Sequence, residues 1–95
     1  MSELPDLHMG TLTAEGVREL AADLRACAER LQVVPKRGAQ RYVVPANLSL
    51  AEAVEALLAG ELTGLQLRYL HEGREWWDTL MARGPSYHLV RVAHD

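Results

Sequence analysis

The chain has little cysteine: Cys27 is the only one among its 95 residues. A single thiol excludes a disulfide within the chain and excludes any metal site built from several cysteines. Cys27 stands at helical spacing among apolar residues. This position predicts a small apolar filler of the core and not a reactive thiol.

Long apolar runs and targeting signals are also missing. The longest apolar runs extend over only a few residues, whereas a membrane-spanning helix needs about 20. The first residues lack the basic stretch and the apolar core of a signal peptide. We therefore expect no membrane segment and a cytoplasmic protein.

Catalytic signatures are absent from the sequence. It contains no nucleophile elbow, no phosphate-binding glycine loop and no H-E-x-x-H motif. An enzyme would have to use Asp78 as a base or as the orienting partner of a histidine, with Thr79, Ser86 or Cys27 as nucleophile. These residue types occur in almost any domain, and a short chain leaves little room for a deep pocket. A noncatalytic protein is therefore the preferred interpretation, and an enzyme centred on Asp78 is an alternative.

Histidines are the only candidate metal ligands of note. His88 and His94 have the same parity in a predicted strand, but six residues of strand span roughly 20 Å, too far for both to bind one ion. His71 could approach either of them across the sheet, but no close His/Glu ligand pair on a helix and no cysteine ligand supports a site. We expect neither a metal nor another cofactor.

Positive charge is concentrated in one segment. Lys36, Arg37 and Arg41 lie in a stretch without acidic residues, although the whole chain has a net charge of −3. These side chains, together with Arg68, are able to contact phosphates while an aromatic ring stacks on a base. Because the net charge is negative and no RNA-binding aromatic motif is present, nucleic-acid binding is an alternative and not the main hypothesis.

The N-terminal third predicts an arm followed by a helix. Residues 1–11 show no sustained period, which predicts a flexible N-terminal arm. Apolar residues then recur at steps of three and four as far as Leu31. They predict an amphipathic helix of about five turns that begins at Thr13, whose hydroxyl can cap it. A single domain is expected over residues 12–95.

The middle of the chain predicts a connector and a second helix. Within the connector, residues 40–44 are expected to form a short edge strand before a proline. Ser49 and Glu52 have the spacing of a capping box. They predict a helix that starts at Leu50 and stops at Gly60.

The C-terminal third predicts a β-meander. Residues 64–70 alternate in polarity, Gly73 allows a turn, and residues 76–81 return as a second strand. A second turn at residues 84–86 precedes a third strand over residues 87–94, with Val90 and Val92 on one side and Leu89 and Arg91 on the other.

The first turn leaves two registers open, and a slip by one residue exchanges the faces of the strand. A two-residue turn places Tyr69 opposite Trp76, and a three-residue turn places Tyr69 opposite Trp77 and Arg68 opposite Asp78. We favour the three-residue turn because it aligns apolar side chains on one face and opposite charges on the other. It predicts that Trp76 lies on the outer face and that Asp78 is the outward partner of Arg68.

Together the elements predict an α+β domain with two helices packed on one face of a three- or four-stranded antiparallel sheet that ends in a C-terminal β-meander. Adjacent strand residues point to opposite faces, so one of the two tryptophans must lie on the face without helices. An exposed indole suits contact with a partner. The alternative is that Arg68 or Arg74 covers this ring by stacking on it.

We therefore expect a noncatalytic binding or accessory protein that works through protein–protein contacts on the outer sheet face or an exposed edge. Its partner is expected to be another protein or a second copy of the chain in a homodimer. The predicted contact residues are Arg68, Leu70, Trp76, Val90 and Val92.

Overall fold

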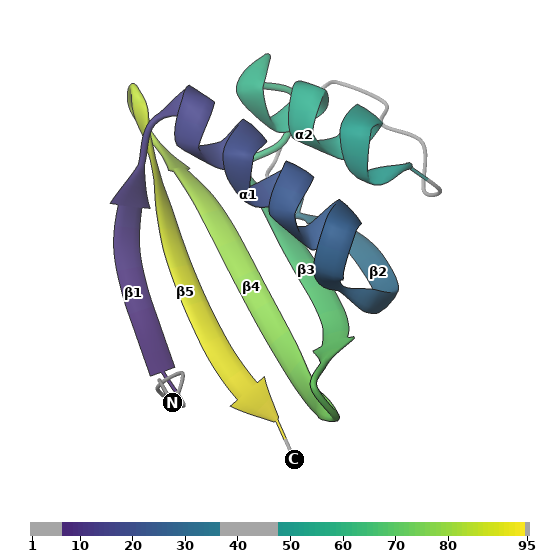
Figure 1. The fold of residues 1–95 in the computed structure, drawn as a ribbon. Helices are drawn as coiled ribbons and strands as arrows, with labels where there is room; N and C mark the ends of the chain where they lie inside the picture. Colours follow the sequence, from purple (N-terminus) through teal and green to yellow (C-terminus); the bar gives the residue numbers. More distant parts are fainter. Residues whose placement is uncertain (1–6, 37–47, 95) are drawn as a thin grey trace.

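The computed structural model describes residues 7–36 and 48–94. In these ranges the elements follow the order β1 (Leu7–Leu12), α1 (Ala14–Cys27), β2 (Glu29–Lys36), α2 (Leu50–Leu58), β3 (Gly64–His71), β4 (Arg74–Arg83) and β5 (Ser86–His94). The strands form one antiparallel sheet in the order β1-β5-β4-β3-β2. Both helices lie on the same face of this sheet (Figure 1).

The architecture is α+β with a C-terminal meander, as expected, but the sheet has five strands and not three or four. Neither helix of the described ranges has the length and apolarity needed to cross a bilayer.

The first strand corrects the prediction of a flexible arm over residues 1–11. Residues Leu7–Leu12 form β1, which pairs with β5 from Leu7 opposite Val92 to Leu12 opposite Tyr87. Without β1, the backbone groups of β5 at this edge would lack strand partners. Backbone pairing of this kind needs no alternating side-chain pattern, so the strand left little signal in the sequence.

The second strand replaces the end of the predicted first helix. α1 stops at Cys27, and Ala28 at its C-cap already has extended dihedral angles. β2 follows at once and pairs with β3. Leu31 continues the three- and four-residue steps of the helix, yet it also starts the alternation of the strand, so periodicity alone could not separate the two. The edge strand predicted at residues 40–44 lies outside the described residues.

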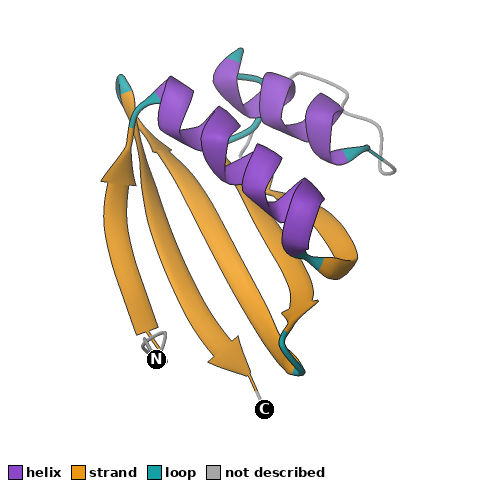
Figure 2. Cartoon of the chain, in the orientation of Figure 1, coloured by secondary structure: helices purple, strands orange, loops and turns teal. Residues whose placement is uncertain are grey.

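The helix caps are as predicted. The Thr13 hydroxyl accepts a hydrogen bond from the Gly16 backbone N–H at 3.0 Å. Ser49 and Glu52 form the capping box, with each side chain accepting from the other residue's backbone N–H at 3.1 and 3.0 Å. Gly60, just after the last turn of α2, has a φ of 83°. Local polar residues therefore define where both helices begin. Figure 2 shows the two helices in purple.

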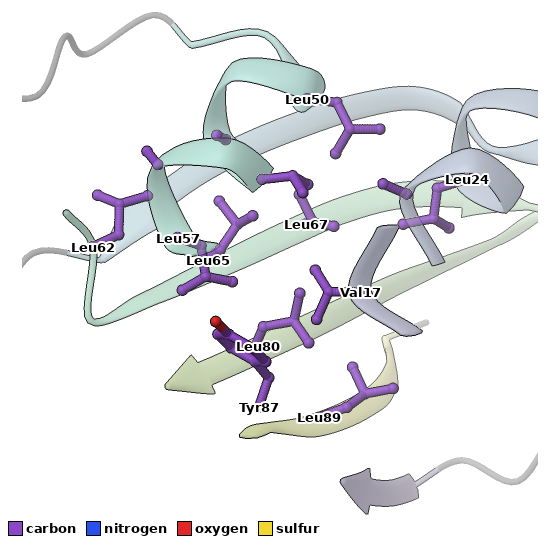
Figure 3. Packing of buried hydrophobic residues seen from close by; sticks show 14 of the residues in the cluster. Val17, Leu24, Leu50, Leu57, Leu62, Leu65, Leu67, Leu80, Tyr87 and Leu89 are labelled. Atoms are coloured by element: carbon purple, nitrogen blue, oxygen red, sulfur yellow. The ribbon is translucent and has the colours of Figure 1, made fainter. Parts of the chain in front are cut away.

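The hydrophobic core fills the space between the helices and the sheet (Figure 3). Its largest fully buried apolar side chains are Val17, Leu57, Leu62, Leu65, Leu67 and Leu80. Burial of each stabilises the fold by about 1.5–3 kcal/mol. Cys27 does not join this core: it is exposed at the last position of α1, so its prediction as an apolar filler is wrong.

Candidate functional site

The turn between β3 and β4 decides which residues face the helices. It consists of Glu72 and Gly73, with φ angles of 52° and 80°. Positive φ at both positions is the mark of the type I′ turn, whose twist matches that of the two strands. Tyr69 therefore lies opposite Trp76. The two-residue register is the one adopted, and the preference for the three-residue turn is wrong.

This register sends the two tryptophans to opposite faces. Trp76 lies on the face covered by the helices and is only 3% exposed. The predicted position of Trp76 on the outer face is therefore wrong, and Trp77 takes that position, opposite Arg68. The physical reason is the shift by one residue, which moves every side chain of β4 to the other face.

Trp77 is held by three neighbours on the sheet surface. The guanidinium carbon of Arg68 lies 4.1 Å from the centroid of the indole, and the His94 ring centroid is also 4.1 Å away. The indole N–H donates a hydrogen bond of 2.6 Å to Glu75. The stacking of Arg68 on the outer ring, which we considered as an alternative, is thus present. It leaves Trp77 partly exposed and fixed in one orientation.

The uncovered face, here called the outer face, divides into two parts according to the strand register. On β1, β5 and β4 it carries the apolar side chains of Met9, Trp77, Met81, Val90 and Val92, with Glu75, Thr79, His88 and His94 among them. On β3 and β2 it carries the polar side chains of Gln32, Lys36, Gln66 and Arg68, together with Val34 and Leu70. Met9 is 57% exposed, and it is the large apolar side chain that the described residues leave most open to solvent.

Four of the five predicted contact residues come together on the outer face: Arg68, Leu70, Val90 and Val92. Trp76 does not join them. The sequence prediction does not include Trp77, Met81 and Met9, because the three-residue turn puts the first two on the covered face and Met9 lies in the predicted N-terminal arm. Gly73 adopts a positive φ readily and so allows the two-residue turn, whereas Glu72 is not a residue type that this turn favours at its first position.

The basic residues proposed for nucleic acid are only partly described. Lys36 ends β2 and lies on the outer face, two strands away from Met81 in the same row. Arg68 occupies the same face. Arg37 and Arg41 lie outside the described residues.

Asp78 lies on the opposite face and is fully buried. It accepts two hydrogen bonds of 2.8 Å from the Nε and Nη2 atoms of Arg91. The Tyr69 hydroxyl lies 3.1 Å from both of its oxygens. The prediction that Asp78 is the outward partner of Arg68 is therefore wrong. Within the described chain its side-chain partners are an arginine and a tyrosine, whereas a role in orienting a histidine would need a histidine beside it.

Asp78, Arg91 and Tyr69 are here called the buried cluster. Its tyrosine predicts that the stability of the fold decreases at alkaline pH. Burial, and then the negative charge of Asp78, raise the pKa of Tyr69 well above its ordinary value of 10.0. Because the folded-state pKa is raised, its contribution to stability is complete below about pH 10 and is lost as the pH rises further. We expect the urea midpoint of the wild type to fall more steeply above pH 10 than that of Tyr69→Phe. Parallel curves for the two proteins would contradict the buried position of the hydroxyl.

The described residues contain no group of three or more histidine, cysteine, aspartate or glutamate side chains placed to hold a metal ion. His88 and His94 both belong to the outer face, at the two ends of β5.

No protein-family model matches the chain, and no curated protein or solved structure matches it. Evidence for a function therefore comes from the side chains of the outer face and from the buried cluster.

Proposed function

We propose that this chain is a small noncatalytic binding protein that associates with a second copy of itself through the outer face. The observation that supports this proposal is the arrangement of the two layers. Both helices cover one face of the sheet, whereas the other face carries Met9, Trp77, Met81, Val90 and Val92. No described element covers these side chains.

The size of the outer face is compatible with a dimer. Five strands at about 4.8 Å spacing and a strand length near 26 Å give a face of roughly 600 Å². Two copies would bury on the order of 1,200 Å², which is at the lower end for specific protein–protein interfaces. Two sheets can pack face to face in this way with their side chains interdigitated.

The outer face carries few charges for its size. The strand register places Lys36, Arg68 and Arg83 there as positive side chains and Glu75 as a negative one. The apolar side chains, and not the charges, are therefore the feature that a second copy would cover. A two-fold axis through the apolar part sets identical apolar side chains against each other.

Trp77 is suited to be the centre of this contact. Tryptophan is enriched among the residues that contribute most to binding. Since Arg68, His94 and Glu75 already hold the indole, little conformational freedom remains to be lost on association.

Sedimentation velocity across a concentration series tests the proposal. We expect a wild-type dimer, and we expect Trp77→Ala to raise the dissociation constant at least about thirtyfold, the effect of losing about 2 kcal/mol. Glu19→Ala, an exposed change on α1, should leave association unchanged. Circular dichroism confirms that each variant is folded.

A wild-type monomer at every concentration would remove the homodimer from the proposal. Salt-dependent binding of RNA or DNA that is lost in Lys36→Ala and kept in Trp77→Ala would instead support the nucleic-acid alternative.

A further inference from the structure

The covered face of the sheet contains a pocket that is separate from the outer face. The C-terminal half of α1 and the strands β3, β4 and β5 line an open pocket of about 300 Å³, which is at the lower end for small-molecule sites. Its apolar wall is formed by Leu20, Leu24 and Trp76. Tyr69 and Arg91 of the buried cluster also line the pocket. Asp23 and Cys27 line it as well, and both are exposed to solvent.

Arg91 has unused hydrogen-bonding capacity. A guanidinium group has five N–H donors, and Asp78 takes one from Nε and one from Nη2. Arg91 also forms a side-chain hydrogen bond with Tyr69. These three hydrogen bonds leave further N–H donors of the guanidinium group for another acceptor, and 20% of the Arg91 side chain is exposed.

The cluster holds this arginine in a fixed orientation. Two hydrogen bonds of 2.8 Å join Arg91 to Asp78, and Tyr69 in turn donates to the carboxylate. Hydrogen bonding to Asp78 raises the pKa of Arg91 above its already high value, so the guanidinium keeps its charge. A charged and oriented guanidinium edge beside an apolar wall matches a carboxylate on an apolar body, because arginine binds carboxylates with two parallel hydrogen bonds.

We propose that this pocket binds a small molecule with a carboxylate on an apolar body, held by the remaining guanidinium donors of Arg91 and by Leu20, Leu24 and Trp76. The site is independent of the proposed self-association, because Trp76 and Arg91 lie on the opposite side of the sheet from Trp77 and Val90.

Asp23 can distinguish two classes of ligand that carry a carboxylate on an apolar body, namely amino acids and simple acids. It lines the same pocket and carries a negative charge, which suits the ammonium group of an amino acid and not a simple acid. A free acid such as 3-phenylpropionate and the amino acid phenylalanine share the carboxylate and the apolar body. Preferential binding of phenylalanine that is lost in Asp23→Asn would identify an amino acid, and preferential binding of 3-phenylpropionate would identify a simple acid. Either result supports the site.

Cys27 offers a direct measurement, since it is the only thiol of the chain and lines the pocket. We expect 3-phenylpropionate to slow the reaction of Cys27 with a thiol reagent in a saturable manner. The neutral amide, 3-phenylpropionamide, should need a concentration at least about tenfold higher for the same protection, because it lacks the charge that Arg91 recognises. In a Trp77→Phe background, the remaining fluorescence from Trp76 should change over the same range of ligand concentration.

A variant in which the three residues of the buried cluster are replaced by apolar ones provides the control for recognition of the carboxylate. Tyr69→Phe, Asp78→Leu and Arg91→Met in one chain remove the charges together, which proteins tolerate better than the loss of one partner. In this variant the acid should protect Cys27 no better than the amide does. Equal protection by acid and amide in the wild type, or no protection by phenylalanine and 3-phenylpropionate, would overturn the proposal whether or not the triple variant folds.

Discussion

Asp78→Asn is expected to lower the free energy of unfolding by about 3 kcal/mol or more. The carboxylate is fully buried, and its charge is balanced by Arg91. The change leaves that guanidinium mostly buried without its counterion. Because 20% of the Arg91 side chain still reaches solvent, we place the effect at the lower end of the roughly 3–5 kcal/mol seen for broken buried pairs.

Urea unfolding followed by circular dichroism measures this effect. The matched control is Asp23→Asn, which removes an exposed carboxylate from α1 and should change the free energy of unfolding by less than about 0.5 kcal/mol. The triple variant with Tyr69→Phe, Asp78→Leu and Arg91→Met should recover most of the loss. An Asp78→Asn protein as stable as the wild type would contradict the buried ion pair.

Trp76→Ala and Trp77→Ala are expected to differ sharply although the residues are adjacent. Trp76 is 3% exposed and packs in the core, so its truncation should cost about 3–5 kcal/mol. Trp77 lies on the outer face, and at concentrations where the chain is monomeric its truncation should cost about 1 kcal/mol or less. Both are measured by urea unfolding in dilute solution. The reverse order of stability would indicate the three-residue turn and the other register.

Features with local causes could be predicted from the sequence. Thr13 and Ser49 cap the two helices where their side chains allow it, and the turn residues separate the three strands of the meander. The parity of Val90 and Val92 also holds, since both lie on the outer face. Each of these depends on a few neighbouring residues.

Features that depend on distant residues could not be predicted in this way. β1 exists because β5 offers it an edge, and β2 begins where the helical period still continues. The other register of the first hairpin was favoured because it pairs Asp78 with Arg68 on the outer face, whereas the observed register buries Asp78. Its counterion comes from Arg91 on the next strand, and this pairing is visible only when all three strands are in place.

The register of the first hairpin also explains which predicted contact residues lie on the outer face and which one does not. Arg68, Leu70, Val90 and Val92 were assigned to the outer face and lie there. The prediction that Trp76 is the outward tryptophan depended on the three-residue turn, so it was wrong for the same reason. With Trp77 in that position, the apolar part of the outer face becomes continuous across β4 and β5.

The most direct test of the proposed dimer asks whether association covers Trp77 itself. Trp76→Phe leaves Trp77 as the only tryptophan and keeps an aromatic ring in the core. Acrylamide quenching of its fluorescence is then measured over a range of protein concentrations that spans the dimer equilibrium. We predict strong quenching in dilute solution and protection at high concentration. Equal quenching at all concentrations would contradict an interface on the outer face, even if the chain were found to dimerise.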